Sequence, residues 1–331
     1  MPCEFNTKLC RSDPHRTLPI KNRYMTAAND LKRKKISLVA FVGALCEELG
    51  NRRRQRTAET YRAALTSLLK FTGSDMPLKA LTATLVGAYE GWLCERGVAL
   101  NTSSFYMRVL RAIYNRAVVA GLVADTRPFS EVYTGIGPTP KRALSLSAIS
   151  AIKRLDLSRR PALAFARDMF LVGFYLRGMS FVDMAYLKAA DMIGDHVIYN
   201  RRKTGQMLTV KWLPQIAEIV GRYPPNPTGR LLPILVDKGA TDAEERRAYR
   251  SAASRVNRNL KKVGEMAGIS GRLTMYAGRH SWATGAQSLG APLSVISQGL
   301  GHDSERTTRI YLASLDVGVI DRMSALIASS L

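Results

Sequence analysis

The sequence predicts a mainly α-helical protein with one small β-sheet, divided into two domains. The chain has 331 residues, a length typical of about two domains. Apolar residues recur at helical spacing through most of it. One stretch, "HVIYNRRKTGQMLTVKW" at 196–212, instead alternates around a Lys-Thr-Gly turn, as a β-hairpin does. The second domain is therefore expected to be α+β.

The first 125 residues predict a basic arm followed by four helices. Residues 1–35 are polar and basic without helical period, and we interpret them as a flexible arm. Residues 36–125 contain four apolar stripes at i, i+3 and i+4, at 37–50, 57–73, 84–97 and 101–121. Each stretch stops at a glycine (Gly50, Gly73, Gly97 and Gly121), and Asn101 is the expected N-cap of the fourth. These features indicate a four-helix domain.

The rest of the chain predicts a linker and the second domain. Residues 126–146 contain prolines and glycines and lack a period, which indicates a linker. Within 147–331, helices are expected at 147–156, 160–177, 213–222 and 242–268, with more toward the C-terminus. The tail spaces its apolar residues as a short amphipathic helix, which could pack on its own domain or on a neighbouring copy: Val319, Ile320, Met323, Leu326 and Ile327.

The charge of the chain indicates a polyanionic partner. Forty-nine Lys and Arg residues against 26 Asp and Glu give a net charge of +23, and each basic group that meets a phosphate releases condensed counterions. No apolar run approaches the roughly 20 residues of a membrane span, and the N-terminus lacks the apolar stretch of a signal peptide. The four cysteines show no metal-ligand spacing, so we expect neither disulfides nor zinc, and a reducing cytoplasm.

Chemistry on nucleic-acid phosphates without a bound metal needs three kinds of group. The sequence has no nucleotide-binding or zinc motif and no acidic pair spaced for two metals, so we expect no cofactor. A nucleophile must attack phosphorus, cations must stabilise the charge on the non-bridging oxygens, and an acid must protonate the departing sugar oxygen. Arginine suits the second role because its planar guanidinium donates bidentately and stays charged. Tyrosine suits the first, since a phosphotyrosine ester keeps the bond energy for rejoining.

One long stretch carries such groups in order. Residues 273–314, "LTMYAGRHSWATGAQSLGAPLSVISQGLGHDSERTTRIYLAS", resemble the C-terminal signature of the tyrosine recombinases, or phage integrases. That signature runs His-x-x-Arg-His, then Leu-Gly-His, then Thr-Thr-x-x-Tyr. The resemblance assigns Arg279 as the second catalytic arginine, with His280 beside it. It assigns His302 as the Leu-Gly-His histidine and Tyr311 as the nucleophile. In "RRKTGQ", Lys203 matches the β-turn lysine that usually serves as general acid.

Two positions depart from the family's pattern. The histidine of His-x-x-Arg is Tyr276 here, whose phenol can still donate a hydrogen bond to phosphate. The first-arginine motif, Thr-Gly-Leu/Met-Arg-x-x-Glu, corresponds to "RGMSFVD" at 177–183, with Ser180 at the arginine and Asp183 at the glutamate. Arg177 is expected about one helical turn before Ser180, on roughly the same face, from where its guanidinium could reach the missing place.

Each of these residues, taken alone, has an ordinary structural interpretation. Tyr311 and His280 could be packing residues, His302 a loop histidine, Arg279 a surface cation and Lys203 a solvated turn lysine. Their ordered spacing, combined with the charge and the two domains, favours catalysis.

The resemblance implies a site-specific DNA recombinase or mobile-element integrase that works through a 3′-phosphotyrosine intermediate. It implies that 36–125 is a core-binding domain and 147–331 the catalytic domain, closing as a C-shaped clamp around double-stranded DNA. It further implies a homotetramer on DNA joined through the C-terminal helix, accessory DNA-bending proteins as candidate partners, no membrane, and a cytoplasmic, nucleoid-associated location.

Three alternatives remain open from the sequence. A catalytically impaired DNA-binding protein of the same fold would explain Ser180 and Tyr276. A relaxing enzyme like the type IB topoisomerases would share the chemistry. A structural RNA-binding protein would fit the charge but not the ordered arginine, histidine and tyrosine. The basic stretches 32–35, 51–62 and 255–262 could contact DNA phosphates or be solvated faces.

Overall fold

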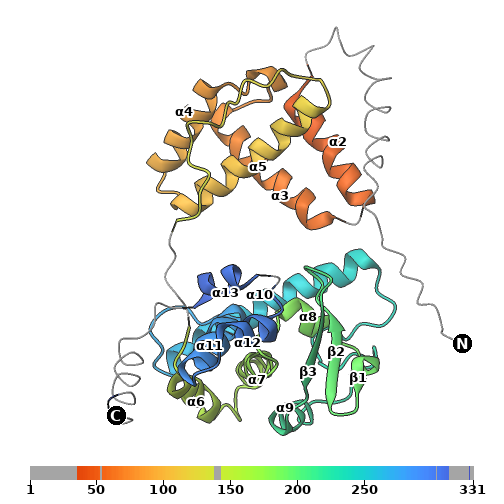
Figure 1. Ribbon diagram of the computed structural model, residues 1–331. Helices are drawn as coiled ribbons and strands as arrows, with labels where there is room; N and C mark the ends of the chain where they lie inside the picture. The colour runs from red at the N-terminus through yellow and green to blue at the C-terminus, as the bar shows by residue number, and fades with distance from the viewer. Residues whose placement is uncertain (1–35, 53, 138–142, 303, 313–327, 329–331) are drawn as a thin grey trace, which may run out of the picture. The chain divides into compact units, whose positions relative to one another are not determined.

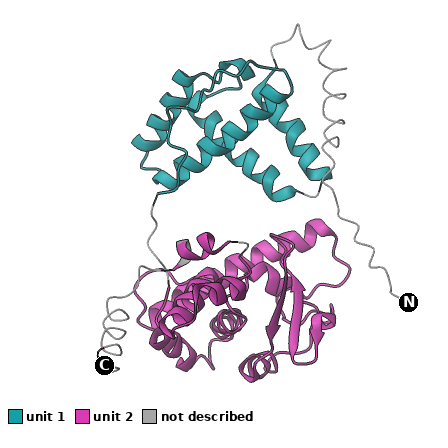
Figure 2. Cartoon of the chain, in the orientation of Figure 1, with its two compact units in different colours: residues 1–139 teal, residues 140–331 magenta. Residues whose placement is uncertain are grey.

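The protein divides into two compact units, residues 1–139 and 140–331, each with its own hydrophobic core (Figure 2). The computed structural model describes residues 36–52, 54–137, 143–302, 304–312 and 328. The predicted arm, 1–35, and the tail helix expected at 319–327 lie outside the described residues. Within the described part of the chain, no helix is both long enough and apolar enough to cross a bilayer.

The described part of the first unit is helical, as its periodicity predicts. Its elements are α2 (Leu38–Asn51), α3 (Gln55–Thr72), the 3-10 turn η1 (Leu78–Ala80), α4 (Ala83–Glu95) and α5 (Leu100–Val119) (Figure 1). The helices α3, α4 and α5 end shortly before Gly73, Gly97 and Gly121. The expected stop at Gly50 is wrong, because α2 continues through this glycine to Asn51.

The predicted N-cap role of Asn101 is also wrong. The helix α5 begins at Leu100 with Ala99 as its N-cap. Asn101 instead binds the backbone of Gly137: its Nδ2 donates to the carbonyl at 3.0 Å, and its Oδ1 accepts from the N–H at 2.7 Å. Phe129 and Val132 are buried in the core of this unit. Residues 126–137 of the expected linker therefore pack against the first unit.

The second unit combines helices with a three-stranded antiparallel sheet of order β1-β2-β3, which lies at one side of the unit (Figure 1). Its elements are α6 (Leu146–Arg154), α7 (Pro161–Tyr175), α8 (Phe181–Tyr186), η2 (Ala189–Asp191), β1 (Met192–Ile193), β2 (His196–Asn200), β3 (Met207–Lys211), α9 (Pro214–Val220), α10 (Asp242–Met266), α11 (Met275–Ser288), α12 (Leu293–Leu300) and α13 (Glu305–Tyr311). The predicted hairpin is β2–β3, in which Val197 pairs with Val210.

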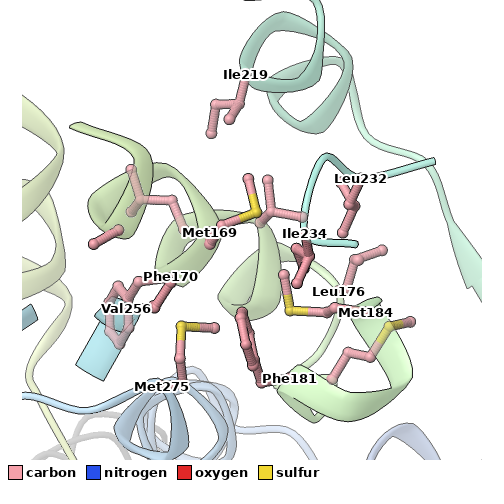
Figure 3. Close-up of a cluster of buried hydrophobic side chains, with 14 of the residues drawn as sticks. Met169, Phe170, Leu176, Phe181, Met184, Ile219, Leu232, Ile234, Val256 and Met275 are labelled. Atoms are coloured by element: carbon pink, nitrogen blue, oxygen red, sulfur yellow. The ribbon is translucent and has the colours of Figure 1, made fainter. Parts of the chain in front are cut away.

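The helix α7 lies at the centre of this unit. It contacts α6, α9, α10 and α11, and it is apolar around much of its circumference, as a surrounded helix must be. Met169 and Phe170 are fully buried. Figure 3 shows them in a cluster with side chains from several other elements, including Phe181 of α8, Val256 of α10 and Met275 of α11. This core fixes the α7–α8 turn against the start of α11, where the candidate residues gather.

Candidate active site

The guanidinium of Arg279 joins two parts of the second unit. Arg279 lies on α11 and is only 6% exposed. Its Nη1 donates to the carbonyl of Gly178 at 3.2 Å, in the turn between α7 and α8. Its Nη2 donates to the carbonyl of Leu300, at the end of α12, and lies 3.0 Å from Nε2 of His302. These contacts therefore hold the charge of Arg279 in a fixed position.

The backbone turn after α12 places His302 beside Arg279. Gly301 adopts the left-handed conformation at φ 62°, its N–H bonds the carbonyl of Gln298, and the N–H of His302 bonds that of Ser297. This pair of bonds is the Schellman arrangement, which reverses the chain at a helix end. Glycine is needed at 301 for a second reason, since a Cβ there would lie 2.8 Å from Leu208 of the hairpin.

The ring of His302 also contacts the helix that carries Tyr311. Its Nδ1 lies 2.8 Å from the hydroxyl of Thr308, a fully buried residue of α13. A guanidinium can only donate, so Nε2 of a neutral imidazole accepts from Arg279 and Nδ1 donates to Thr308. The chain Arg279–His302–Thr308 thus links α11, α12 and α13. Tyr311 is the last residue of α13, and its side chain lies outside the described part of the chain.

The turn between α7 and α8 corrects the expected position of Arg177. Arg177 and Ser180 do not share a helical face, because α7 ends at Tyr175 and α8 begins at Phe181. Arg177 and Gly178 both have left-handed backbones, with φ of 56° and 70°. The side chain of Arg177 crosses to the hairpin, where Nη1 donates to the carbonyl of Thr209 at 3.3 Å.

Gly178 allows this turn to approach α11. A Cβ at this position would lie 2.4 Å from the Cα of Arg279, which is impossible without moving the backbone. The short distance is what lets Arg279 reach the carbonyl of Gly178.

Ser180 and Asp183 support the hairpin and bring no positive charge to the site. Ser180 is the N-cap of α8, where its hydroxyl accepts from the N–H of Asp183 and donates to that carboxylate at 2.6 Å. The other carboxylate oxygen of Asp183, a buried residue, accepts from the N–H of Arg202 at 2.9 Å. The guanidinium of Arg202 lies over the ring of Tyr186, 3.8 Å from its centroid. These contacts fix the start of the hairpin turn.

Lys203 lies in that turn and is exposed. It makes no hydrogen bond or ion pair within the described part of the chain, so the structure does not bring it into contact with Arg279 or His302. Arg201, at the base of this turn, does contact the backbone beside His302. Nη1 of Arg201 donates to the carbonyl of Gly301 at 2.5 Å. Sequence reasoning did not single out Arg201; its position two residues before Lys203 was the available signal.

Several charged side chains lie close to Tyr199, a buried residue of β2. Burial raises the pKa of its phenol, and the charge of Asp183 raises it further. The charges of Arg201, Arg279 and Arg177 act on the same phenol in the opposite direction and lower its pKa. Three arginines therefore lie near one phenol, which stays neutral at ordinary pH.

Tyr276 and His280 lie on successive turns of α11. Their rings meet edge to face, with centroids 4.9 Å apart and planes at 86°. Tyr276 is half exposed, and it borders the same cavity as Arg279. Tyr276 and the buried Arg279 therefore face the same cavity.

Comparison with known sequences gives matches in both units. Residues 37–132 match the family model described as the phage integrase SAM-like domain, and residues 231–317 match that of the phage integrase family. The tyrosine recombinase XerC of Rhodospirillum centenum is 28% identical over 272 residues, which cover 77% of this chain and 76% of that protein.

Comparison with solved structures shows a common fold. The lambda integrase dimer bound to a COC′ core site aligns with a TM-score of 0.64 and 14% identity, covering 87% of this chain and 80% of that one. The lambda integrase tetramer bound to a Holliday junction aligns with a TM-score of 0.63 and 13% identity, over the same shares of the two chains.

Proposed function

Since this chain belongs to the tyrosine recombinase family, also called the phage integrase family, we propose that it cleaves and rejoins DNA through a 3′-phosphotyrosine link at specific sites. One observation carries the assignment of its residues. Arg279 is hydrogen-bonded to His302, and His302 is hydrogen-bonded to Thr308. Thr308 lies three positions before Tyr311 on the same helix. A phosphate-binding pair is thereby connected to the helix of the nucleophile.

In the proposed reaction, several donors hold the scissile phosphate. Arg279 binds its non-bridging oxygens together with His302, whose Nε2 takes up a proton in order to donate to the phosphate, and with Tyr276 donating from the first turn of α11. Arg177 supplies the second guanidinium in place of the arginine missing at Ser180, and its approach to the hairpin supports this role. Donors fixed before the reaction stabilise the developing charge at little reorganisation cost.

The covalent step exchanges one phosphate ester for another. The phenolic oxygen of Tyr311 attacks phosphorus and forms the O–P bond, while the bond from phosphorus to the 5′ oxygen breaks. Lys203 gives a proton to that oxygen, releasing a 5′-hydroxyl. The proton of the Tyr311 phenol leaves to solvent, and His280 positions the groups or assists this transfer. The 5′-hydroxyl of a partner strand then reverses the step. Because Lys203 is exposed in the described structure, we expect the turn to move onto the DNA.

The proposed partners are duplex DNA and three further copies of the chain. One of the structures of similar fold is a lambda integrase tetramer on a Holliday junction. We propose the same assembly here, joined through the C-terminal helix, with accessory DNA-bending proteins as further candidates and the nucleoid as the place of action.

A covalent adduct is the test of this function. The full chain is incubated with nicked duplexes from the DNA flanking its own gene, and denaturing gels are read for protein-linked DNA. We expect an adduct with the wild-type chain and none with Tyr311→Phe, which lacks the attacking oxygen. A catalytically impaired DNA-binding protein would give no adduct with either. Relaxation of plasmids without a specific site would instead favour a topoisomerase.

The same assay tests Arg177. Removing one charged donor from a phosphate-transfer site commonly slows the reaction by about 10²–10³-fold, and we expect a loss of this size for Arg177→Ala. Arg154→Ala, an exposed arginine on α6, is the matched control and should react at the wild-type rate. Unchanged cleavage by Arg177→Ala would remove this residue from the mechanism.

A further inference from the structure

A cavity of about 710 Å³ lies beside Arg279 in the second unit. Its walls come from the α7–α8 turn, from α10 and from the first turn of α11. Three cations line it that have no part in the proposed reaction: Arg258 and Lys261 of α10, and Arg272 before α11. The cavity thus extends the positive charge away from the catalytic residues.

The charge in this cavity is not balanced by the surrounding protein. No aspartate or glutamate is among the described residues that line it. Arg258 and Arg272 make no ion pair within the described part of the chain, and both are exposed. Lys261 has an exposed pair with Glu265 at 3.7 Å, a kind of contact that contributes little. Like charges that share a cavity repel unless an anion lies between them.

A hydroxyl group also fits an anion here. Oγ1 of Thr274, the N-cap of α11, is buried and has no hydrogen-bond partner in the described structure. Thr274 lines the cavity at the N-terminal end of this 14-residue helix, where the helix dipole favours negative charge. Guanidinium groups, a hydroxyl donor and a helix N-terminus together match the chemistry of a phosphate.

We propose that this cavity holds a second DNA backbone phosphate, next to the scissile one, contacted by Arg258 and Arg272. The proposal rests on the proposed function, because it takes the scissile phosphate to lie at Arg279. The two sites share a wall, since Arg279 and Tyr276 border the same cavity. In this arrangement, successive phosphates of one strand occupy the two sites. Holding two points on the backbone fixes the register in which the strand meets Tyr311.

The first test measures the salt dependence of binding. The full chain with Arg258→Ala and Arg272→Ala together is compared with wild type on a duplex, by fluorescence anisotropy across a range of KCl. The slope of log affinity against log salt should become shallower by about 0.9 for one lost phosphate contact. Arg247→Ala is the matched control: it is an exposed arginine of α10 that does not line the cavity. Its slope should stay close to that of wild type.

The second test locates the phosphate. A single neutral methylphosphonate is placed in turn at each backbone position around the cleavage site. The wild-type chain should lose affinity about tenfold or more at the scissile position and at one neighbour, as expected for a lost charged hydrogen bond. The double variant should bind more weakly and lose its sensitivity at that neighbour alone, whereas Arg247→Ala should keep both.

Two results would overturn the proposal. In the first, the double variant keeps the wild-type salt slope and the wild-type methylphosphonate pattern. In the second, the double variant loses its sensitivity to methylphosphonate only at the scissile position. These outcomes do not depend on whether Tyr311 forms an adduct. A chain that forms the adduct but fails both tests has the proposed function without the second phosphate site, whereas absence of the adduct rejects the proposed function itself.

Discussion

The imidazole of His302 is held on both sides, by Arg279 at Nε2 and by Thr308 at Nδ1. Each contact fixes the ring in one orientation and one tautomer. Once Nε2 carries a proton, a ring oriented in this way can donate to a phosphate oxygen without a search among rotamers, which lowers the entropic cost of binding. Thr308 is therefore expected to act through His302.

Thr308→Val should separate this role from packing, because valine keeps the shape and removes the hydroxyl. Loss of one hydrogen bond of about 1 kcal/mol predicts about fivefold slower adduct formation. Thr307→Val is the control, since Thr307 is exposed on the same helix. Single-turnover cleavage of a nicked substrate is the measurement. Equal rates for the two variants would show that His302 needs no partner at Nδ1.

For single residues, the sequence predicted which side chains are candidates for the site better than it predicted what those side chains contact. The resemblance of 273–314 to the family signature identified Arg279 and His302 as candidates, and the structure places Nη2 of one 3.0 Å from Nε2 of the other. The contacts of Arg201 could not be predicted, because they depend on how the hairpin packs against Gly301, a residue 100 positions away.

Among the elements, the turn between α7 and α8 determines the geometry around Arg279. The expected helix 160–177 ends early, at Tyr175. Periodicity could not reveal this end, since the apolar pattern continues while the backbone turns toward α11. The close approach of Gly178 to Arg279 determines the backbone conformation of this turn. It depends on the packing of two segments that are distant in the sequence.

Gly178→Ala should therefore disrupt the second unit. The left-handed backbone alone costs alanine about 1 kcal/mol, and the overlap with Arg279 should bring the loss to about 3 kcal/mol or more. Gly194→Ala is the matched control, because Gly194 has φ of 60° and nothing within 4 Å of an added Cβ. Urea unfolding measures both, and equal losses would contradict a role for the close approach.

For the whole molecule, the two hydrophobic cores have consequences for stability. Leu110 lies in the first core and Leu176 in the second, and both are almost fully buried. Separate cores predict that each unit opens cooperatively by itself. The helical class and the two-part organisation could be predicted from long periodic stretches and length. The packing of 126–137 on the first unit could not, since it depends on bonds to Asn101 and Ser104.

Leu110→Ala and Leu176→Ala test this independence. Each cavity should lower the free energy of unfolding by about 2–5 kcal/mol. Hydrogen exchange read by mass spectrometry should then show faster exchange only in the unit that carries the substitution. Faster exchange across both units from either variant would mean that they unfold together.

The hydrogen bond between His302 and Thr308 couples the orientation of the histidine ring to the position of α13. A recombinase that cuts DNA before its partner site is bound would leave a broken strand. Because the orientation of His302 depends on the position of α13, displacement of α13 would move Tyr311, the proposed nucleophile, and would free the ring beside Arg279 at the same time. A copy of the chain with α13 displaced could then bind DNA without cutting it.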